Sequence, residues 1–440
     1  MATEKIRSSV GLRLIVITVL SLVLLIPAFM IERLIHERKA TRKSAVWEVS
    51  EKWGGSQLLA GPILTVPLKK QYKDDKGNVT TSIQYAHFLP DELSIQGDVS
   101  PQIRRRGIYE VVLYNGKLKV SGSFPHPVIN DLGISEQEIM WKDAFLSLGI
   151  TDMKGIKETI KITWNDSDLT ANPGIKSNDV IRSGVSTKVE LNETRKSNTF
   201  SFNVDLNGSQ ELKFVPVGKE TRVIVSSSWN APSFQGGFLP EKREISKNGF
   251  TVEWKVLQLN RNYPQKWVGK HYEIQHSAFG VNLLMPVDHY QKTMRTVKYA
   301  LLFIGLTFMS FFIIEILNKK AIHHIQYLLI GFALLLFYTL LLSLSEHIPF
   351  GYSYLIASSC TVLMITAYTK SVLLSKIITS VIGVILSILY GFLYVLLQVE
   401  DYALLLGSIG LFVILGIFMY ITRKIDWYTV IKNEGVKDHV

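Results

Sequence analysis

The sequence predicts an α+β membrane protein, with one N-terminal and five C-terminal transmembrane helices and a large exported, β-rich antiparallel domain between them. Hydrophobic residues make up 47% of the 440 residues and charged residues only 19%, against about 25% charged in soluble proteins. The apolar excess is confined to one N-terminal run and one C-terminal block. The residues between them alternate in short apolar and polar runs, which are typical of β-strands.

The N-terminal run is interpreted as an uncleaved transmembrane anchor, residues 14–34, after a cytoplasmic N-terminus of residues 1–13. It exceeds the about 7–15 apolar residues of a signal peptide, and no small-x-small cleavage site follows it. Arg13 stands just inside the run, and Pro27 is expected to kink its outer end. Charged residues with helical spacing come next, so the helix is expected to continue to Trp53 and to end at Gly54 and Gly55.

Residues 35–296 are predicted to form the periplasmic β-rich domain. Strands are expected at residues 58–68, 83–88, 108–114, 118–120, 185–191, 200–206, 223–227, 250–257 and 272–274. Asn115-Gly116 has the sequence of a two-residue hairpin turn, and further turns are expected at residues 75–78 and 247–249. One helix is predicted at residues 135–148, because Ser135 and Glu138 form a capping-box pattern and Gly149 is a stop signal.

Two stretches of this domain share an order of motifs. Gly55-Ser56-Gln57-Leu58, Val66-Pro67 and Phe88-Leu89-Pro90 are followed later by Gly208-Ser209-Gln210-Glu211-Leu212, Val215-Pro216 and Phe238-Leu239-Pro240. The order matches and the spacings differ, so an internal duplication into two tandem β units is one interpretation. The aromatic-rich segment 231–240 is interpreted either as a partner-binding surface or as a structural loop.

The C-terminal block is predicted to be a five-helix transmembrane domain, residues 297–422, followed by a cytoplasmic tail, residues 423–440. The helices are expected at residues 297–317, 325–345, 352–368, 377–397 and 402–422. The charges between them alternate in sign at intervals close to the about 20 residues of one bilayer crossing. Because Lys and Arg stay on the cytoplasmic side, both termini are predicted to be cytoplasmic.

The net charge is +11, and many of the positive residues flank apolar runs, so the lipid bilayer is the expected partner and no nucleic acid is expected. A single cysteine, Cys360, rules out an intramolecular disulfide. The histidines do not have metal-ligand spacing, and the sequence has no phosphate loop and no dinucleotide glycine fingerprint. No catalytic residue, cofactor or metal site is therefore predicted.

Polar residues in the membrane block form the candidate functional cluster, because such residues are costly in lipid and usually mark a site. They are Glu315, His324, Gln326, Tyr327, Ser345 and Glu346. A contact between Glu315 and His324 across their short loop is expected. One interpretation is a proton- or ligand-coupled site. The preferred one is an interfacial salt bridge that fixes the hairpin, because polar residues at helix ends reach the interface.

The cluster around Ser345 and Glu346 also contains Ser343 and His347, which invites comparison with a hydrolase. Catalysis requires the hydroxyl within hydrogen-bond reach of the base and a third group that orients the base. Adjacent residues on one helix end point in different directions. They are therefore not expected to form a triad by themselves.

Motifs spread over nearly the whole chain resemble those of the bacterial inner-membrane CreD family. The first is Ser50-Glu51-Lys52-Trp53-Gly54-Gly55-Ser56-Gln57. The others lie at residues 61–67, 195–202, 229–240, 259–267, 311–315, 324–327, 337–347, 400–408 and 422–428. Glu315, His324, Gln326, Tyr327, Ser345 and Glu346 belong to these matching segments.

The resemblance implies a protein of the bacterial inner membrane that contributes to envelope integrity or stress response, and it implies no defined reaction. Its protein partner, an envelope protein or the cell wall, would meet the exported domain. A transporter or channel-like protein that uses the polar residues of the membrane helices is the alternative. This alternative requires those residues to converge in a cavity between helices.

Overall fold

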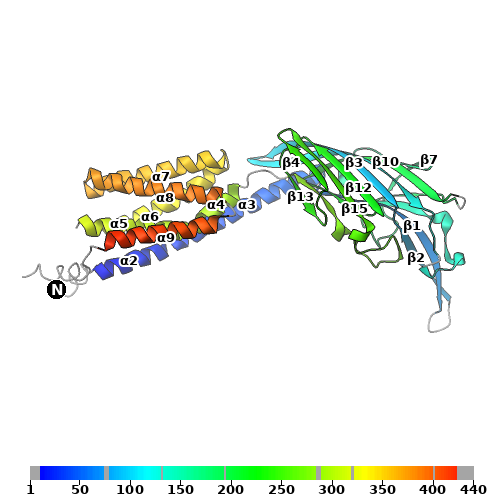
Figure 1. Cartoon of the computed structure of the whole chain (residues 1–440), viewed down its shortest axis with the longest axis horizontal. Helices are drawn as coiled ribbons and strands as arrows, with labels where there is room; N and C mark the ends of the chain where they lie inside the picture. Colours follow the sequence, from blue (N-terminus) through cyan, green and yellow to red (C-terminus); the bar gives the residue numbers. More distant parts are fainter. Residues whose placement is uncertain are drawn as a thin grey trace, which may run out of the picture. The chain divides into compact units, whose positions relative to one another are not determined.

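The chain forms two compact units, residues 1–41 together with 287–440, and residues 42–286. The structure, a computed structural model (Figure 1), describes residues 10–73, 79–129, 132–192, 195–283, 289–318, 322–399 and 402–423. The second unit is thus inserted in the sequence between the first and second long apolar helices of the first. Here the first is called the membrane unit and the second the β unit.

Apolar helices dominate the membrane unit. The helices of the described chain are α2 (Val10–Val23), α3 (Leu25–Trp53), α4 (His289–Lys298), α5 (Ala300–Asn318), α6 (His324–Ser345), α7 (Phe350–Leu373), α8 (Lys376–Gln398) and α9 (Ala403–Thr422). Within the described ranges, six helical segments are long and apolar enough to cross a membrane, counting α2 and α3 as one. The prediction of one N-terminal and five C-terminal helices is confirmed.

The N-terminal helix is interrupted once, at Leu24, between α2 and α3. Pro27 follows three residues later, and a proline lacks the N–H that would bond the carbonyl four residues before it. Backbone bonds from Leu24 to Leu20 and from Ala28 to Leu24 carry the helix across the break. As predicted, α3 ends at Trp53, where Gly54 adopts a φ of 142° that only glycine tolerates well.

Two mixed sheets build the β unit. In the described chain, the nine-stranded sheet has the order β13-β17-β11-β1-β5-β9-β8, with β2 beside β1 and β16 beside β2. Its strands are β1 (Gln57–Lys73), β2 (Val79–Phe88), β5 (Phe145–Ile150), β8 (Asn172–Pro173), β9 (Gly184–Lys188), β11 (Glu211–Val215), β13 (Pro232–Gly236), β16 (Lys266–Val268) and β17 (Phe279–Leu283).

The second sheet has eight strands within the described residues, in the order β14-β15-β12-β3-β4-β10-β6-β7. They are β3 (Glu92–Arg106), β4 (Tyr109–Pro125), β6 (Lys161–Trp164), β7 (Ser167–Thr170), β10 (Ser197–Ser209), β12 (Glu220–Ser227), β14 (Lys242–Ser246) and β15 (Gly249–Leu257). Short 3-10 helices lie at Glu136–Glu138, Trp141–Asp143, Met153–Gly155, Gln258–Asn260 and Ile274–Ser277.

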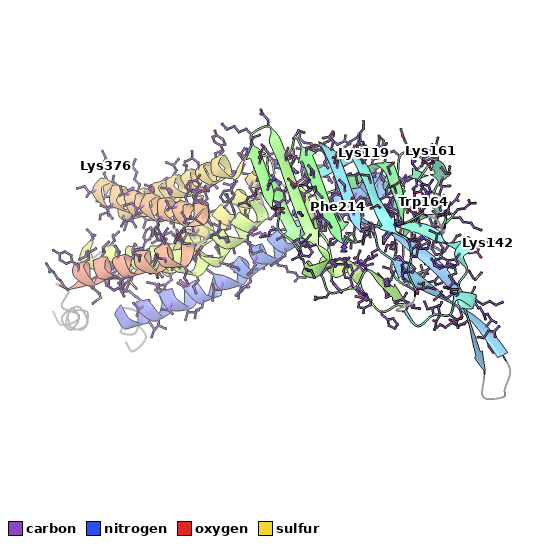
Figure 2. All side chains as sticks on the ribbon, turned by 45° about the vertical axis from the view of Figure 1, so that its right-hand side comes forward. Lys119, Lys142, Lys161, Trp164, Phe214 and Lys376 are labelled. Atoms are coloured by element: carbon purple, nitrogen blue, oxygen red, sulfur yellow. The ribbon has the colours of Figure 1, made fainter. Side chains whose placement is uncertain are left out.

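The two sheets share one hydrophobic core. Trp254 of the eight-stranded sheet contacts Phe279 of the nine-stranded sheet, with ring centroids 5.4 Å apart. Of the residues labelled in Figure 2, Trp164 and Phe214 are buried, and Lys119 and Lys161 are exposed. This alternation follows from the two-residue period of a strand that faces a core on one side.

The predicted antiparallel character holds for every strand pair described except two. β1 pairs with β11 in parallel, matching Gln57 with Leu212, and β12 pairs with β3 in parallel along eight residues, from Glu220 to Ser227. The two stretches interpreted as an internal duplication therefore lie side by side at β1 and β11. The outward neighbours also correspond, since β5 flanks β1 as β17 flanks β11.

The hairpin predicted at Asn115-Gly116 is wrong. Both residues lie inside β4, where Asn115 is paired with Ser100 on one side and Asn207 on the other. The turn falls earlier, at Gly107, whose φ is 60°. The continuous ladders on both sides of β4 outweigh the local turn preference of the dipeptide.

The helix predicted at residues 135–148 is also wrong. The segment contains two 3-10 turns and then β5, and all six residues of β5 are buried. A strand between β1 and β9 buries both faces, so its apolar run has no alternation to separate it from a buried helix. The capping contact itself exists, because the Ser135 N–H donates to Glu138 Oε2 at 3.2 Å.

The remaining predictions for the β unit concern two turns, one strand and the segment 231–240. The turn at residues 247–249 is confirmed between β14 and β15. Residues 272–274 form no strand and lead into the 3-10 helix Ile274–Ser277. In segment 231–240, Phe234 belongs to β13 and packs on Trp254, and Phe238 packs on Phe279. The turn expected at residues 75–78 lies outside the described residues.

Candidate functional site

A buried carboxylate lies near the end of α5 in the membrane unit. The Glu315 side chain is 3% exposed, and its Oε1 accepts a hydrogen bond from Arg13 Nη1 of α2 at 2.9 Å. Its Oε2 accepts from the Tyr327 hydroxyl of α6, also at 2.9 Å. Both oxygens are therefore bonded, and three helices that are distant in sequence meet at one side chain.

Aromatic rings pack against this cluster. Tyr327 is 1% exposed, and its ring contacts Phe308 and Phe311 of α5, at centroid distances of 5.4 and 6.4 Å. A carboxylate in such surroundings is costly unless a cation and further donors satisfy it. Arg13 supplies the charge and Tyr327 the second donor. The arrangement ties α2 to α5 and α6.

The expected contact between Glu315 and His324 is corrected by this geometry. His324 is the first residue of α6, and its side chain is exposed, with its ring 5.7 Å from that of His323. Gln326 is used at the same helix end, where its Oε1 accepts from the His323 backbone N–H at 2.9 Å. The partner of Glu315 on α6 is Tyr327, which lies one turn further along the helix.

A second polar cluster occupies the other end of α6. Glu346 Oε1 accepts from the Tyr290 hydroxyl of α4 at 2.8 Å, and Tyr290 is 1% exposed. Ser345 is buried, and its hydroxyl donates to the Leu342 carbonyl of its own helix. The Nδ1 atom of His347 lies 3.0 Å from the Ser343 carbonyl oxygen. Serine, histidine and acid thus bond different groups, as expected for adjacent residues on a helix end.

The six predicted residues consequently form two groups and not one site. Glu315, His324, Gln326 and Tyr327 lie at one end of the α5–α6 hairpin, and Ser345 and Glu346 at the other. Tyr327 and Ser345 are eighteen positions apart on α6, about 27 Å at a rise of 1.5 Å per residue.

Comparison with known proteins places this chain in a family. The family model described as "Inner membrane protein CreD" matches residues 9–428. "Inner membrane protein CreD" of Escherichia coli (strain K12) is 33% identical over 414 residues, which cover 92% of this chain and 91% of that protein. The chain belongs to the CreD family. It is therefore a multi-pass protein of the inner membrane whose apolar helices contact the lipid bilayer.

Both polar clusters of this CreD family member lie inside the matched region. Two of their members were not predicted as site residues, Arg13 and Tyr290. Arg13 carried a signal in the sequence, because a charge inside an apolar run needs a partner. Tyr290 carried none, since it stands in an ordinary polar segment before the second long apolar helix.

Across the described ranges, no group of three or more His, Cys, Asp or Glu side chains is placed to hold a metal ion. The described side chains of both clusters are instead bonded to one another or to their own helix backbone. The chemistry that these contacts support is the holding together of helices.

Proposed function

We propose that this CreD family member supports envelope integrity or the response to envelope stress through an exported β unit, and that it catalyses no reaction of its own. The observation that carries the proposal is the insertion of a complete, separately cored unit of residues 42–286 between the first and second long apolar helices. A unit of this size with its own core is suited to binding an envelope partner, protein or cell wall.

The orientation is part of the proposal. Six crossings return the chain to its starting side. Basic residues precede the first crossing, lie between the second and third and between the fourth and fifth, and follow the sixth, which favours a cytoplasmic placement of both termini. Phosphatase and fluorescent-protein fusions at residues 320 and 370 should report cytoplasm, and those at residues 346 and 401 periplasm. A periplasmic signal at residue 370 contradicts this topology.

The two polar clusters are proposed to hold the membrane unit together. Glu315 bonds groups on α2 and α6, and Glu346 bonds a group on α4. These residues do not favour the transporter alternative, because the two clusters lie at opposite ends of α6 and not in one cavity between helices.

The role of the β unit is tested by complementation in a strain that lacks the protein. The full chain should restore resistance to detergent and exclusion of a hydrophobic dye. A chain with residues 57–283 replaced by a flexible linker should not, when immunoblots show equal amounts in the membrane. Equal rescue by the linker chain contradicts the proposal.

Partners are sought with a photo-crosslinking amino acid placed on the exposed face of the β unit in intact cells. Position 119 on β4 is exposed, and position 120 next to it is fully buried. Crosslinks to one defined envelope component from position 119, absent from position 120, would identify the partner. If a set of exposed positions on both sheets yields only lipid or solvent products, the proposed contact is wrong.

A further inference from the structure

The β unit contains a cavity that the proposed function does not use. Its volume is about 580 Å³, and it is lined by the start of β1, the end of β5 and residues 178–183, 270–273 and 275. Pockets for small ligands commonly span about 300–1,000 Å³. The floor is apolar, with Ala60, Ile150 and Ile181 each at most 5% exposed.

Basic side chains stand on the cavity wall. Arg182, Lys270 and His271 line the cavity and are exposed. Within the part of the chain that the structure describes, none of these three side chains makes a hydrogen bond or an ion pair. Many other surface cations of the unit have a carboxylate, as Lys188 has Asp143 and Arg195 has Asp166. Arg182 and Lys270 therefore bring positive charge to the cavity that no bonded carboxylate offsets among the described residues.

One carboxylate on the wall is held from behind by a buried histidine. Asp179 lines the cavity, and its Oδ2 is 3.3 Å from His87 Nε2. His87 is 2% exposed, and its Nδ1 is 3.0 Å from the Thr65 hydroxyl. Burial lowers the pKa of His87, although Asp179 acts in the opposite direction. A neutral ring then donates from Nε2 to Asp179 and accepts at Nδ1 from Thr65, which fixes the carboxylate.

The second acid of the wall is occupied elsewhere. Glu273 Oε2 lies 2.9 Å from His276 Nε2, and both side chains are strongly exposed. Asp179 is 25% exposed and is oriented by the buried His87, so it is the carboxylate that we choose as the ligand contact. An oriented carboxylate and a pair of uncompensated cations thus face one apolar floor.

We propose that this cavity binds a short peptide whose two termini are free. The terminal carboxylate pairs with Arg182 and Lys270, the terminal ammonium donates to Asp179, and small apolar side chains lie on the floor of Ala60, Ile150 and Ile181. A ligand that carries only negative charge would be repelled by Asp179. A ligand that carries only positive charge would be repelled by Arg182 and Lys270. A zwitterion satisfies both kinds of group.

The test is titration calorimetry on the full chain in detergent with trialanine as the probe. N-acetyl-trialanine and trialanine amide, each lacking one terminal charge, are the comparison probes. Trialanine should bind saturably at one site per chain. Removal of either terminal charge should weaken binding about tenfold or more, because each charge-assisted bond is lost without replacement.

Variants assign the two ends. Arg182→Gln with Lys270→Gln should weaken trialanine about tenfold or more and leave trialanine amide unchanged. Asp179→Asn should weaken trialanine and leave N-acetyl-trialanine unchanged. Lys161→Gln is the matched control, because Lys161 is exposed on β6 of the other sheet (Figure 2). Far-ultraviolet circular dichroism confirms that each variant is folded.

Three results would overturn the inference. One is the absence of saturable trialanine binding at millimolar concentration. Another is equal binding of free and end-blocked peptides, which would indicate a merely apolar pocket. The last is equal loss in Lys161→Gln and in the Arg182 and Lys270 double variant, which would indicate a general charge effect. The site is assigned by binding alone, so failure of the proposed envelope role leaves it standing.

Discussion

Among the described residues, the membrane unit and the β unit each bury one formally charged side chain, and its charge is satisfied differently in the two units. Glu315 in the membrane unit meets an opposite charge, Arg13, and a hydroxyl, Tyr327. Arg261 in the β unit, 7% exposed, meets no carboxylate among the described residues. It donates to the carbonyls of Tyr263 at 2.7 Å and Val217 at 3.2 Å, and it bonds the Gln265 side chain.

The difference reflects what each environment supplies. Between membrane helices the backbone carbonyls are used within the helices, so a buried charge must find another side chain. In the β unit, the loops around Arg261 leave carbonyls free to act as acceptors, and the Tyr263 ring lies 4.2 Å from the guanidinium carbon. Burial lowers the pKa of Arg261, and Tyr263 counteracts it.

The largest effect is expected from Arg13→Met, which leaves the Glu315 carboxylate without its cation. Breaking a buried ion pair from one side costs about 3–5 kcal/mol. The measurement is unfolding of the full chain by dodecyl sulfate in mixed micelles, followed by helical circular dichroism. The double variant Arg13→Met, Glu315→Met should recover most of the loss. A double variant less stable than the single one contradicts the pairing.

Arg261→Met should cost somewhat less, about 2–3 kcal/mol, because it strands carbonyls and not a charge. Native-state hydrogen exchange of the amides in β11 and β12 measures the loss in free energy. Arg261→Lys is the control, since a point charge cannot reproduce the forked contacts of a guanidinium. If Lys restores full stability, charge matters more than geometry and the contrast between the units weakens.

A matched pair of tyrosine variants sharpens the contrast. Tyr327→Phe removes a donor to a carboxylate and should cost about 1.5–3 kcal/mol, whereas Tyr263→Phe removes a donor to a neutral group and should cost about 0.5–1.5 kcal/mol. The hydroxyl of Tyr263 lies 3.1 Å from the Pro216 carbonyl and 2.9 Å from the Ser277 hydroxyl. The loss for Tyr327→Phe is measured by unfolding in dodecyl sulfate, as for Arg13→Met, and the loss for Tyr263→Phe by hydrogen exchange, as for Arg261→Met. Equal losses would show that the charge of Glu315 adds nothing.

The smallest effect is a pH dependence in the β unit. Burial lowers the pKa of His87 below its ordinary value of 6.5. The unfolded chain therefore binds a proton at a higher pH than the folded one, and stability is lost as pH falls below about 6.5 towards the folded pKa. Hydrogen exchange of β2 amides at pH 7.5 and pH 5.5 measures this slope. His87→Gln should flatten the slope, whatever its own cost, and an unchanged slope contradicts the assignment.

Short-range sequence patterns were sufficient to predict the transmembrane helices and the end of α3. Apolar runs of bilayer length indicate spans without knowledge of neighbours, and Gly54 ends α3 because of its own backbone freedom. Seven of the seventeen described strands of the β unit lie where a strand was predicted, namely β1, β2, β4, β9, β10, β12 and β15, and the other ten were not predicted. Local signals failed for Asn115-Gly116 and for Phe145–Ile150, where strands on both sides decide the structure.

The partners at the candidate site required information that sequence patterns do not contain. Glu315 and Tyr327 were singled out as polar residues in an apolar block, but Arg13 is 302 positions from Glu315. His324 was the nearer candidate in sequence, yet it lies at the exposed start of α6. Packing of α2 against α5 and α6 decided between them, and no periodicity reports that packing.

The Arg13–Glu315 bond also imposes an order on biosynthesis. The ribosome makes Arg13 first, and its partner follows 302 residues later, after the whole β unit. The first helix therefore enters the bilayer before Glu315 has been made, which a long side chain near a helix end tolerates by reaching the interface. The bond between Arg13 and Glu315 can form only when α5 has entered the bilayer, so this part of the membrane unit is completed after the β unit has been synthesised.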